Sequence, residues 1–248
     1  CGCGATGRLS LVLETLWRQE CKQLNLTDLS NRVVSFMAGG DAALIKSVED
    51  FEDHPEFAEQ QLMELGFEKN DLLIGSTEGG ETPWVIGAIW KATEVSTRKP
   101  YILYGNTDEV LKENVERSRK FIESELINKI NMNVGSMAVA GSTRMQSTTI
   151  LMYGIGLGLL GCQAMRDARK EVLSWREYAV NNVTTFSSYL NSTDFNIMAK
   201  LVEHESSIYQ RNEQVTYLTD SYYAISILTD TTERAPTFSL NAFENIKD

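Results

Sequence analysis

Residues 2–9 read GCGATGRL, and this short stretch decides how the rest of the chain is interpreted. The first residues resemble the middle of a strand, small residues then turn the chain, and a helical pattern begins near Gly7. The first N–H groups of such a helix face outward, and they favour an anion through the helix dipole and as unsatisfied donors. Because many nucleotide-binding folds share this kind of turn, its meaning depends on the turns further along the chain. The same start predicts that something upstream is missing.

Short apolar runs like the first one recur along the chain. They cover Cys1–Gly4, Val33–Met37, Leu72–Ser76, Tyr101–Tyr104 and Met132–Val134. Longer stretches with helical periodicity separate them, so strand and helix alternate five times. This alternation predicts an α/β fold with a doubly wound, five-stranded parallel sheet flanked by helices on right-handed crossovers.

The expected helices lie between these runs. They cover Gly7–Leu24, Asp41–Leu65, Pro83–Ala92 and Asp108–Leu126. Pro55 is expected to break the second helix, whereas Pro83 begins the third, where its missing N–H has no cost. The apolar stretch Ile150–Met165 contains four glycines and is too short for an average bilayer, so it predicts a buried helix rather than a membrane span.

The pattern of apolar and polar residues changes after Arg166. Residues Arg169–Arg211 are polar and helical, and a new β-α-β pattern then begins with Val215–Leu218. We therefore expect a first domain at 1–167, a helical linker at 168–213 and the incomplete start of a second, similar α/β domain at 214–248.

Composition excludes several kinds of function. The formal net charge is −11 without any run of Lys or Arg, and so acidic a protein repels phosphate backbones, which argues against nucleic-acid binding. Cys1, Cys3, Cys21 and Cys162 show no metal-like spacing, so we expect reduced thiols that serve as small apolar residues in a cytoplasmic protein. No metal and no cofactor are expected.

Three further turns carry candidate chemistry. They are MAGGDAALIKSVEDFED at Met37–Asp53, IGSTEGGETPWVIGAI at Ile74–Ile89 and VGSMAVAGSTRMQSTT at Val134–Thr149. In open parallel sheets, ligands bind outside the carboxyl ends of the strands, which is where these turns are expected to lie.

Together, in this order and spacing, the four turns resemble the SIS domain of the glucokinase regulatory protein and N-acetylmuramate 6-phosphate etherase families. Those families carry G-x-G-T-S-G-R, A-G-G-(D/E), V-E-x-x-E-D, a Gly/Ser turn followed by T-P-x-V, and G-S-(S/T)-R-(M/L)-K. The resemblance covers about Cys1–Asp167. Beyond it, the helical linker and the renewed β-α-β pattern resemble the two-SIS layout of the regulatory protein by pattern alone.

The resemblance implies a site for a phosphorylated hexose or amino sugar. The first and third turns hold the phosphate in the family, and Glu52 aligns with a glutamate at the sugar. The implied ligand-binding residues are Gly4, Ala5, Thr6, Gly7, Glu52, Thr77, Gly79, Gly80, Glu81, Ser142, Thr143 and Arg144. For Glu52 and Arg144 the structural alternative is a helix cap or an interhelical ion pair.

The chain also departs from the family pattern. Leu16 stands where the etherases carry a second catalytic glutamate, and Glu14 lies roughly 200° away around the helix. Gln146 replaces a family lysine and Met137 replaces a glutamate. Glu78 and Glu81 add carboxylates beside the phosphate turn, and if they point inward they favour a ligand with less negative charge, or none.

These observations leave three functions open. The first is a regulatory-protein-like module that binds a sugar phosphate without turnover, which Leu16 favours. The alternative is an etherase, a carbon–oxygen lyase that releases D-lactate, with Glu52 as acid/base. The least supported is an aldose–ketose phosphate isomerase, because neither His54 nor His204 lies in a recognised turn. In each case the expected partner is a second SIS domain, in the same chain or in a homodimer.

Overall fold

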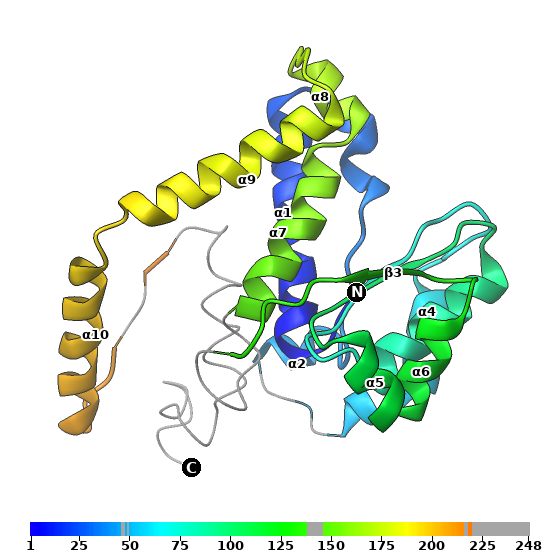
Figure 1. The fold of residues 1–248 in the computed structure, drawn as a ribbon, viewed down its shortest axis with the longest axis horizontal. Helices are drawn as coiled ribbons and strands as arrows, with labels where there is room; N and C mark the ends of the chain where they lie inside the picture. Colours follow the sequence, from blue (N-terminus) through cyan, green and yellow to red (C-terminus); the bar gives the residue numbers. More distant parts are fainter. Residues whose placement is uncertain (46–47, 49, 138–145, 216–217, 220–248) are drawn as a thin grey trace.

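The computed structural model describes residues 1–45, 48, 50–137, 146–215 and 218–219 (Figure 1). Three strands form a parallel sheet in the order β1 (Ile74–Ser76), β2 (Tyr101–Tyr104) and β3 (Asn128–Asn131). Ile74 pairs with Tyr101, and Tyr101 pairs with Asn128, so the three strands start in register. A parallel sheet with helical crossovers is what the alternation of apolar runs predicts.

Two extended segments continue the sheet beyond β1 without forming full strands. Cys1 bonds to β1 through the Ser76 amide, which donates to the Cys1 carbonyl at 2.9 Å. On the other side of the segment, Gly2 forms an isolated parallel bridge with Met37, and the Ala38 amide donates to the Gly2 carbonyl at 3.2 Å. These contacts place Cys1–Gly2 between β1 and the segment around Met37.

The described residues contain three strands, so the expectation of five strands is not confirmed. A helix begins at Gly4, so the first segment has too few residues for a ladder of paired residues. The expected strand at Met132–Val134 is also misplaced, because the last strand is Asn128–Asn131. That strand is polar and partly exposed, since it pairs only with β2 within the described residues, and it gives no apolar run to detect.

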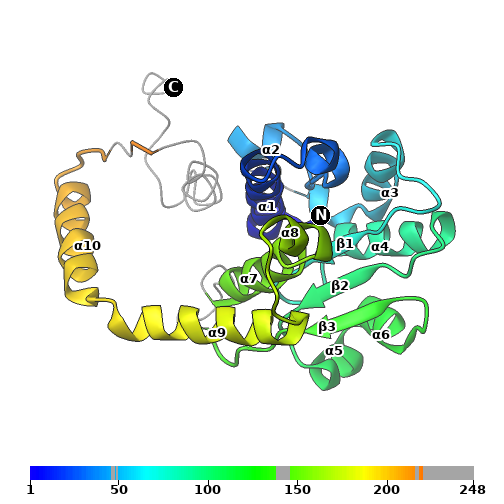
Figure 2. The same ribbon diagram turned by 90° about the horizontal axis from the view of Figure 1, so that it is seen from above.

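Helices cover both faces of the sheet. Their bounds are α1 Gly4–Gln23, α2 Ala42–Ile45, α3 Pro55–Glu64, α4 Pro83–Val95, α5 Asp108–Asn114, α6 Glu116–Glu123, α7 Gln146–Leu160, α8 Gln163–Ala168, α9 Trp175–Ser192 and α10 Phe195–Gln210, with 3-10 turns η1 Thr27–Arg32 and η2 Phe51–Asp53. Figure 2 shows α1 and α7 on one side of the strands and α4 on the other. The doubly wound arrangement is thus present.

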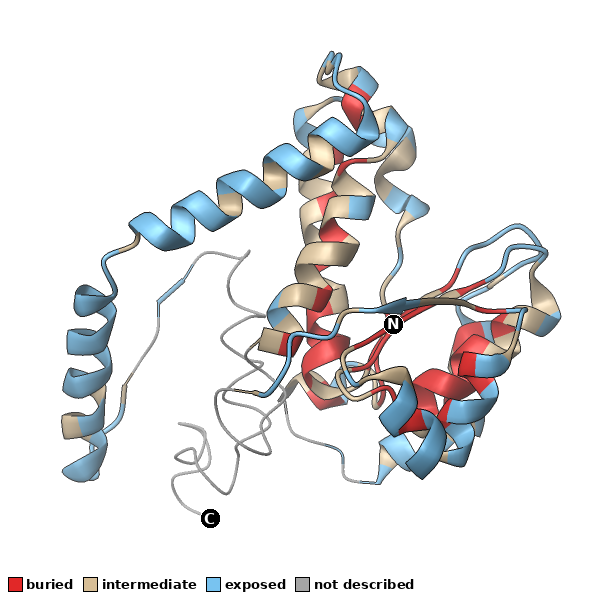
Figure 3. Ribbon diagram, in the orientation of Figure 1, coloured by how far each residue is buried: buried red, intermediate tan, exposed pale blue. Residues whose placement is uncertain are grey.

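Strand β2 divides the core into its two halves. Ile102 and Tyr104 face α3, α4 and α6, where they join Trp84 and Phe121 in the largest buried cluster. Leu103, one residue out of phase, joins the α1 and α7 cluster on the opposite face. This alternation follows from the two-residue period of a strand, and Figure 3 shows buried residues on the helices of both faces.

The helix boundaries confirm the expectations for both prolines and correct one other. Pro55 begins α3 and Pro83 begins α4, each at a first helical position. The single helix expected at Asp108–Leu126 is instead two helices, because Val115 is extended with φ −132° and ψ 101°. The break turns α6 so that the Ser118 hydroxyl donates to the Gly80 carbonyl at 2.7 Å.

The stretch Ile150–Met165 is two helices, α7 and α8, rather than one. In α7 only Ser147, Leu151 and Gly156 are buried and most other residues are half-buried, so the helix packs on the sheet with one face and is less buried than expected. None of the helices in the described part of the chain is long and apolar enough to cross a membrane.

The polar helical stretch after Arg169 is present as α9 and α10. Helix α9 starts at a capping box between Ser174 and Glu177, and its Phe186 stacks on Tyr153 of α7 with ring centroids 4.9 Å apart. Figure 1 shows α10 away from the sheet, and none of its residues is buried. Most of the expected second domain, residues 216–217 and 220–248, lies outside the described residues, so that domain stays a prediction.

We predict that Gly87→Ala destabilises the protein by about 1–3 kcal/mol, as overpacking does. A Cβ atom at Gly87 in α4 would lie 2.5 Å from Pro55 Cβ and 2.8 Å from Pro55 Cα, and the backbone of α3 cannot move aside. This clash outweighs the gain of about 1 kcal/mol in helix propensity. Urea unfolding measures the change.

The matched control is Gly158→Ala in α7, where a new Cβ meets nothing within 4 Å. Its unfolding midpoint should rise. If both variants rise together, the close packing of α3 on α4 is not what restricts Gly87.

Candidate functional site

The first turn of α1 is built by its own side chains. Gly4 has φ +52°, a left-handed conformation that glycine adopts without strain. The Thr6 hydroxyl donates to the Cys3 carbonyl at 2.8 Å and accepts from the Cys3 amide at 3.0 Å. Thr6 is 1% exposed, so its hydroxyl holds the turn closed and is not an open donor for a ligand.

The same turn packs closely on the neighbouring segment. A Cβ atom on Gly7 would lie 2.6 Å from Met37 Cβ, so only glycine allows this approach. Ala5 is also buried. Of the four implied ligand residues in this turn, Thr6 and Gly7 are therefore required by the fold itself, whether or not a ligand binds.

The loop after β1 is closed by a second hydroxyl network. Thr77 Oγ1 lies 2.9 Å from Thr82 Oγ1 and accepts from the Gly80 amide at 3.3 Å. Gly80 has φ +93°, and a Cβ there would lie 2.8 Å from Leu111 Cδ1. Because Thr77 and Gly80 are both buried, they shape the loop, while Gly79 between them is half-buried.

Glu52 reaches the first turn of α1 from a distant part of the sequence. Glu52 lies in the middle of η2, and the residue that precedes this turn, Asp50, has φ +61°. The Cys3 thiol donates to Glu52 Oε2 with a sulfur–oxygen distance of 3.2 Å. The structure thus brings together the first turn and the glutamate that the sequence singled out.

The two carboxylates of the third turn differ in their surroundings. Glu78 is half-buried and accepts from Thr148 Oγ1 of α7 at 3.5 Å. Its charge contributes to raising the pKa of the Cys3 thiol, after burial and Glu52. The Glu81 side chain covers Gly79, since a Cβ atom on Gly79 would lie 3.1 Å from Glu81 Oε1. The Glu81 carbonyl accepts a hydrogen bond from Arg117 Nε.

The electrostatics of the site are dominated by these acids. Burial raises the pKa of the Cys3 thiol well above its usual value, and the charges of Glu52 and Glu78 raise it further. Arg8 is 1% exposed and donates to the Ala43 carbonyl at 2.7 Å, so its cation is held within the fold. In the described residues no group of three His, Cys, Asp or Glu could hold a metal ion.

Not every residue considered from the sequence can be assigned to this edge. Ser142, Thr143 and Arg144 fall outside the described residues. Gln146 donates to the Ser136 carbonyl at 3.1 Å. His54 is exposed, lies 2.9 Å from Glu56 Oε1 and stacks on Phe57, which places it at the start of α3.

Leu16, at the position where the resemblance implies a catalytic glutamate, and the nearby Glu14 both lie on α1. Leu16 is half-buried. Glu14 Oε2 accepts from the Ser35 amide at 2.6 Å and from the Ser35 hydroxyl at 2.5 Å, and Glu14 Oε1 pairs with Arg18 at 2.8 Å. Glu14 therefore anchors the segment around Ser35 and does not replace the missing glutamate.

Cys3 and Ser147 lie at this edge although no pattern in the sequence predicts it. Cys3 occupies the variable position of the first turn, and its partner Glu52 is 49 residues away, so no local pattern links them. Ser147 is 3% exposed, and its hydroxyl lies 3.1 Å from where a Cβ of Gly105 would be. It closes the same edge from the start of α7.

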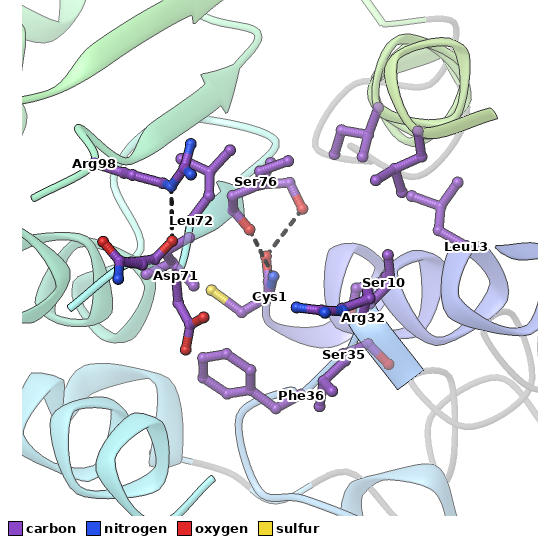
Figure 4. Close-up of a pocket in the computed structure, with 17 residues that line it drawn as sticks. Cys1, Ser10, Leu13, Arg32, Ser35, Phe36, Asp71, Leu72, Ser76 and Arg98 are labelled. Atoms are coloured by element: carbon purple, nitrogen blue, oxygen red, sulfur yellow. Dashed lines mark hydrogen bonds between the residues drawn. The ribbon is translucent and has the colours of Figure 1, made fainter. Parts of the chain in front are cut away.

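A cavity of about 380 Å³ lies at the other end of the strands (Figure 4). Its lining comes mainly from residues that precede β1 and β2, such as Asp71 and Arg98, and from the segment around Ser35. These residues mark the amino ends of the strands. The cavity is thus distinct from the edge where the first and third turns meet.

Comparisons with known proteins agree with the motifs. The family model "Glucokinase regulatory protein N-terminal SIS domain" matches residues 1–93. The chain is 31% identical over 149 residues to an N-acetylmuramic acid 6-phosphate etherase of Edwardsiella ictaluri, covering 60% of this chain and 44% of that protein. A protein of the same name from Rhodopirellula baltica is 40% identical over 94 residues, 38% of this chain and 30% of its own length.

A longer match is found in Staphylococcus saprophyticus. Its N-acetylmuramic acid 6-phosphate etherase is 28% identical over 242 residues, which cover 90% of this chain and 76% of that protein. In the Edwardsiella and Rhodopirellula matches, the chain spans less than half of the relative's length.

We predict that Glu14→Gln lowers the free energy of unfolding by about 1.5–3 kcal/mol, because hydrogen bonds to a charged acceptor are lost. Sugar-phosphate affinity should stay unchanged, since Glu14 faces Ser35. Urea unfolding and calorimetry measure the two quantities. Exposed Glu64, which accepts from Gln60, is the matched control, and Glu64→Gln should change stability by less than about 0.5 kcal/mol. A loss of affinity in Glu14→Gln would instead place Glu14 in the site.

Proposed function

The chain is a SIS-domain protein of the group that comprises the glucokinase regulatory protein and the N-acetylmuramic acid 6-phosphate etherases, and we propose that the carboxyl edge of its sheet binds a phosphorylated hexose or amino sugar. The observation that carries this proposal is the meeting of three distant segments at one edge. The first turn of α1 and Glu52 are joined through Cys3, and the Ser76 amide at the end of β1, just before the third turn, donates to the Cys1 carbonyl at 2.9 Å.

The backbone supplies the attraction for the phosphate. Helix α1 has 20 residues, and its first turn lies at the edge with the positive end of the helix dipole. The loop Thr77–Gly80 lies beside it, held in shape by the Thr77 hydroxyl. The hydroxyls of Thr6 and Thr77 are occupied within the protein, so the proposed phosphate contacts are mainly backbone N–H groups.

Glu78 limits how strongly a phosphate binds. Two unit charges about 8 Å apart repel by roughly 0.5–2 kcal/mol at effective dielectric constants between those of water and a protein surface. The proposed ligand is held by the helix end against this repulsion. A moderate affinity suits a module that responds to changing concentrations of a sugar phosphate.

Binding without turnover is the function that we propose for this half. Leu16 cannot transfer a proton, and Glu14 is bound to Ser35 and Arg18. An elimination needs groups that remove and return protons at suitable places on the substrate. We further propose that the partner is a second SIS domain, in the same chain or in a second copy, within the cytoplasm where sugar phosphates are metabolised.

One observation favours an etherase as the second candidate. Glu52 contacts Cys3, and Glu78 lies in the loop that follows β1 at the same edge of the sheet, so this edge carries two carboxylates from different elements. Glu78 would then replace the glutamate that is missing at Leu16. The relatives named as N-acetylmuramic acid 6-phosphate etherases support this candidate.

We predict that Glu78→Gln tightens binding of N-acetylmuramate 6-phosphate by about tenfold, which corresponds to about 1.4 kcal/mol of removed repulsion. Calorimetry with the phosphorylated and unphosphorylated sugar separates the charge effect, because only the first should respond. Glu109→Gln, in the exposed first turn of α5, is the control and should leave both affinities unchanged. Weaker binding of the phosphorylated sugar in Glu78→Gln would contradict a repulsive Glu78.

The etherase candidate predicts a different result in an assay for D-lactate. Wild-type protein incubated with N-acetylmuramate 6-phosphate would release lactate, and Glu52→Gln and Glu78→Gln would each reduce the rate by at least about a hundredfold, as loss of an acid/base group does. We expect no release from any of the three proteins. Release by the wild type that both substitutions abolish would replace the binding proposal by the etherase.

A further inference from the structure

We propose that Cys3 is a positioning residue of the site, whose thiol holds the carboxylate of Glu52 against the first turn of α1. This inference rests on the proposed sugar-phosphate function, because it concerns how Glu52 is presented to that ligand. No pattern in the sequence assigns Cys3 a part in the site.

The two partners differ in how firmly the fold holds them. Cys3 caps α1, where its amide donates to Thr6 Oγ1 and its carbonyl accepts from the Thr6 hydroxyl and from the Thr6 and Gly7 amides. Glu52 is exposed and lies in a three-residue 3-10 turn. A glutamate in such a turn loses rotamer freedom only through a contact to something rigid, and the Cys3 thiol is that contact.

The charges around Cys3 keep it a donor. Glu52 contacts the thiol from η2, the charge of Glu78 in the loop after β1 also raises the pKa of the thiol, and Arg8 of α1 donates to the Ala43 carbonyl. Burial and the two carboxylates raise the pKa of the thiol, so the proton stays on sulfur at neutral pH. A thiolate would repel Glu52, whereas the neutral thiol donates to it.

The thiol sets the distance of the Glu52 carboxylate from α1 as well as donating a hydrogen bond to it. The sulfur–oxygen distance is 3.2 Å, whereas a hydroxyl donor approaches a carboxylate to about 2.5–2.7 Å. Cys3→Ser should therefore keep the contact and draw the carboxylate closer to α1. Cys3→Ala should release it.

The first experiment measures the thiol directly and needs no ligand. Iodoacetamide reacts with thiolates, so the rate of modification at Cys3, followed by mass spectrometry of its peptide at pH 8, reports its protonation. We expect Glu52→Gln to accelerate modification of Cys3 by at least fivefold and to leave Cys162 of the same protein unchanged. Glu56→Gln is the matched control, because Glu56 contacts His54 instead, and it should change neither rate.

The second experiment measures binding of N-acetylmuramate 6-phosphate by calorimetry. We expect Cys3→Ala to weaken binding by about fivefold and Cys3→Ser by less than twofold. Cys3→Ala should add nothing in a protein that already carries Glu52→Gln, because the two residues act as one unit. An unchanged urea midpoint shows that each variant is folded.

The possible failures are distinguishable. Unchanged modification of Cys3 in Glu52→Gln, or additive losses of affinity in the double variant, would overturn the positioning by Cys3 while ligand binding by the wild type still supports the proposed function. If wild-type protein binds no sugar phosphate, the proposed function fails, and the positioning inference fails with it whatever the thiol rates are.

Discussion

The structure depends on one constraint, which is the pairing of Cys1–Gly2 between β1 and the segment around Met37. The backbone of these two residues bonds on both sides, and the chain then enters a helix at Gly4. Only glycine at position 7 lets that helix start so close to Met37. Because both neighbours end at the same edge of the sheet, their following turns carry Glu52 and Glu78 to the first turn of α1.

The edge combines opposite electrostatic influences. The helix end attracts an anion, whereas Glu78 opposes one, and the Arg8 side chain donates to the Ala43 carbonyl. The affinity of such a site for an anion is the difference between the attraction by the helix end and the repulsion by the carboxylate. The protonated thiol of Cys3 separates these groups, and it does so as a neutral donor at the pH of a cell.

The sequence predicted the parts of the fold that depend on local patterns. Proline at the start of α3 and α4, the period of α1 and the alternation of strand and helix are all visible within a few residues. β3 was misplaced because a polar edge strand has no apolar run, and the break at Val115 interrupts a stretch whose charged, amphipathic pattern is continuous. The contact of Cys3 with Glu52 joins residues 49 positions apart, so it emerges only from the folded chain.

The bond between Ser118 and the Gly80 carbonyl has a consequence for motion. Ser118 is fully buried, and Gly80 is wedged against Leu111 and Tyr104, so the loop after β1 is fastened to the helix pair α5–α6. Opening of the loop alone is unfavourable, because it would leave the buried Ser118 hydroxyl and the Gly80 carbonyl without a hydrogen-bond partner. Loop and helix pair therefore form one cooperative unit of local unfolding, and their slowest amide protons should exchange with solvent at a common rate.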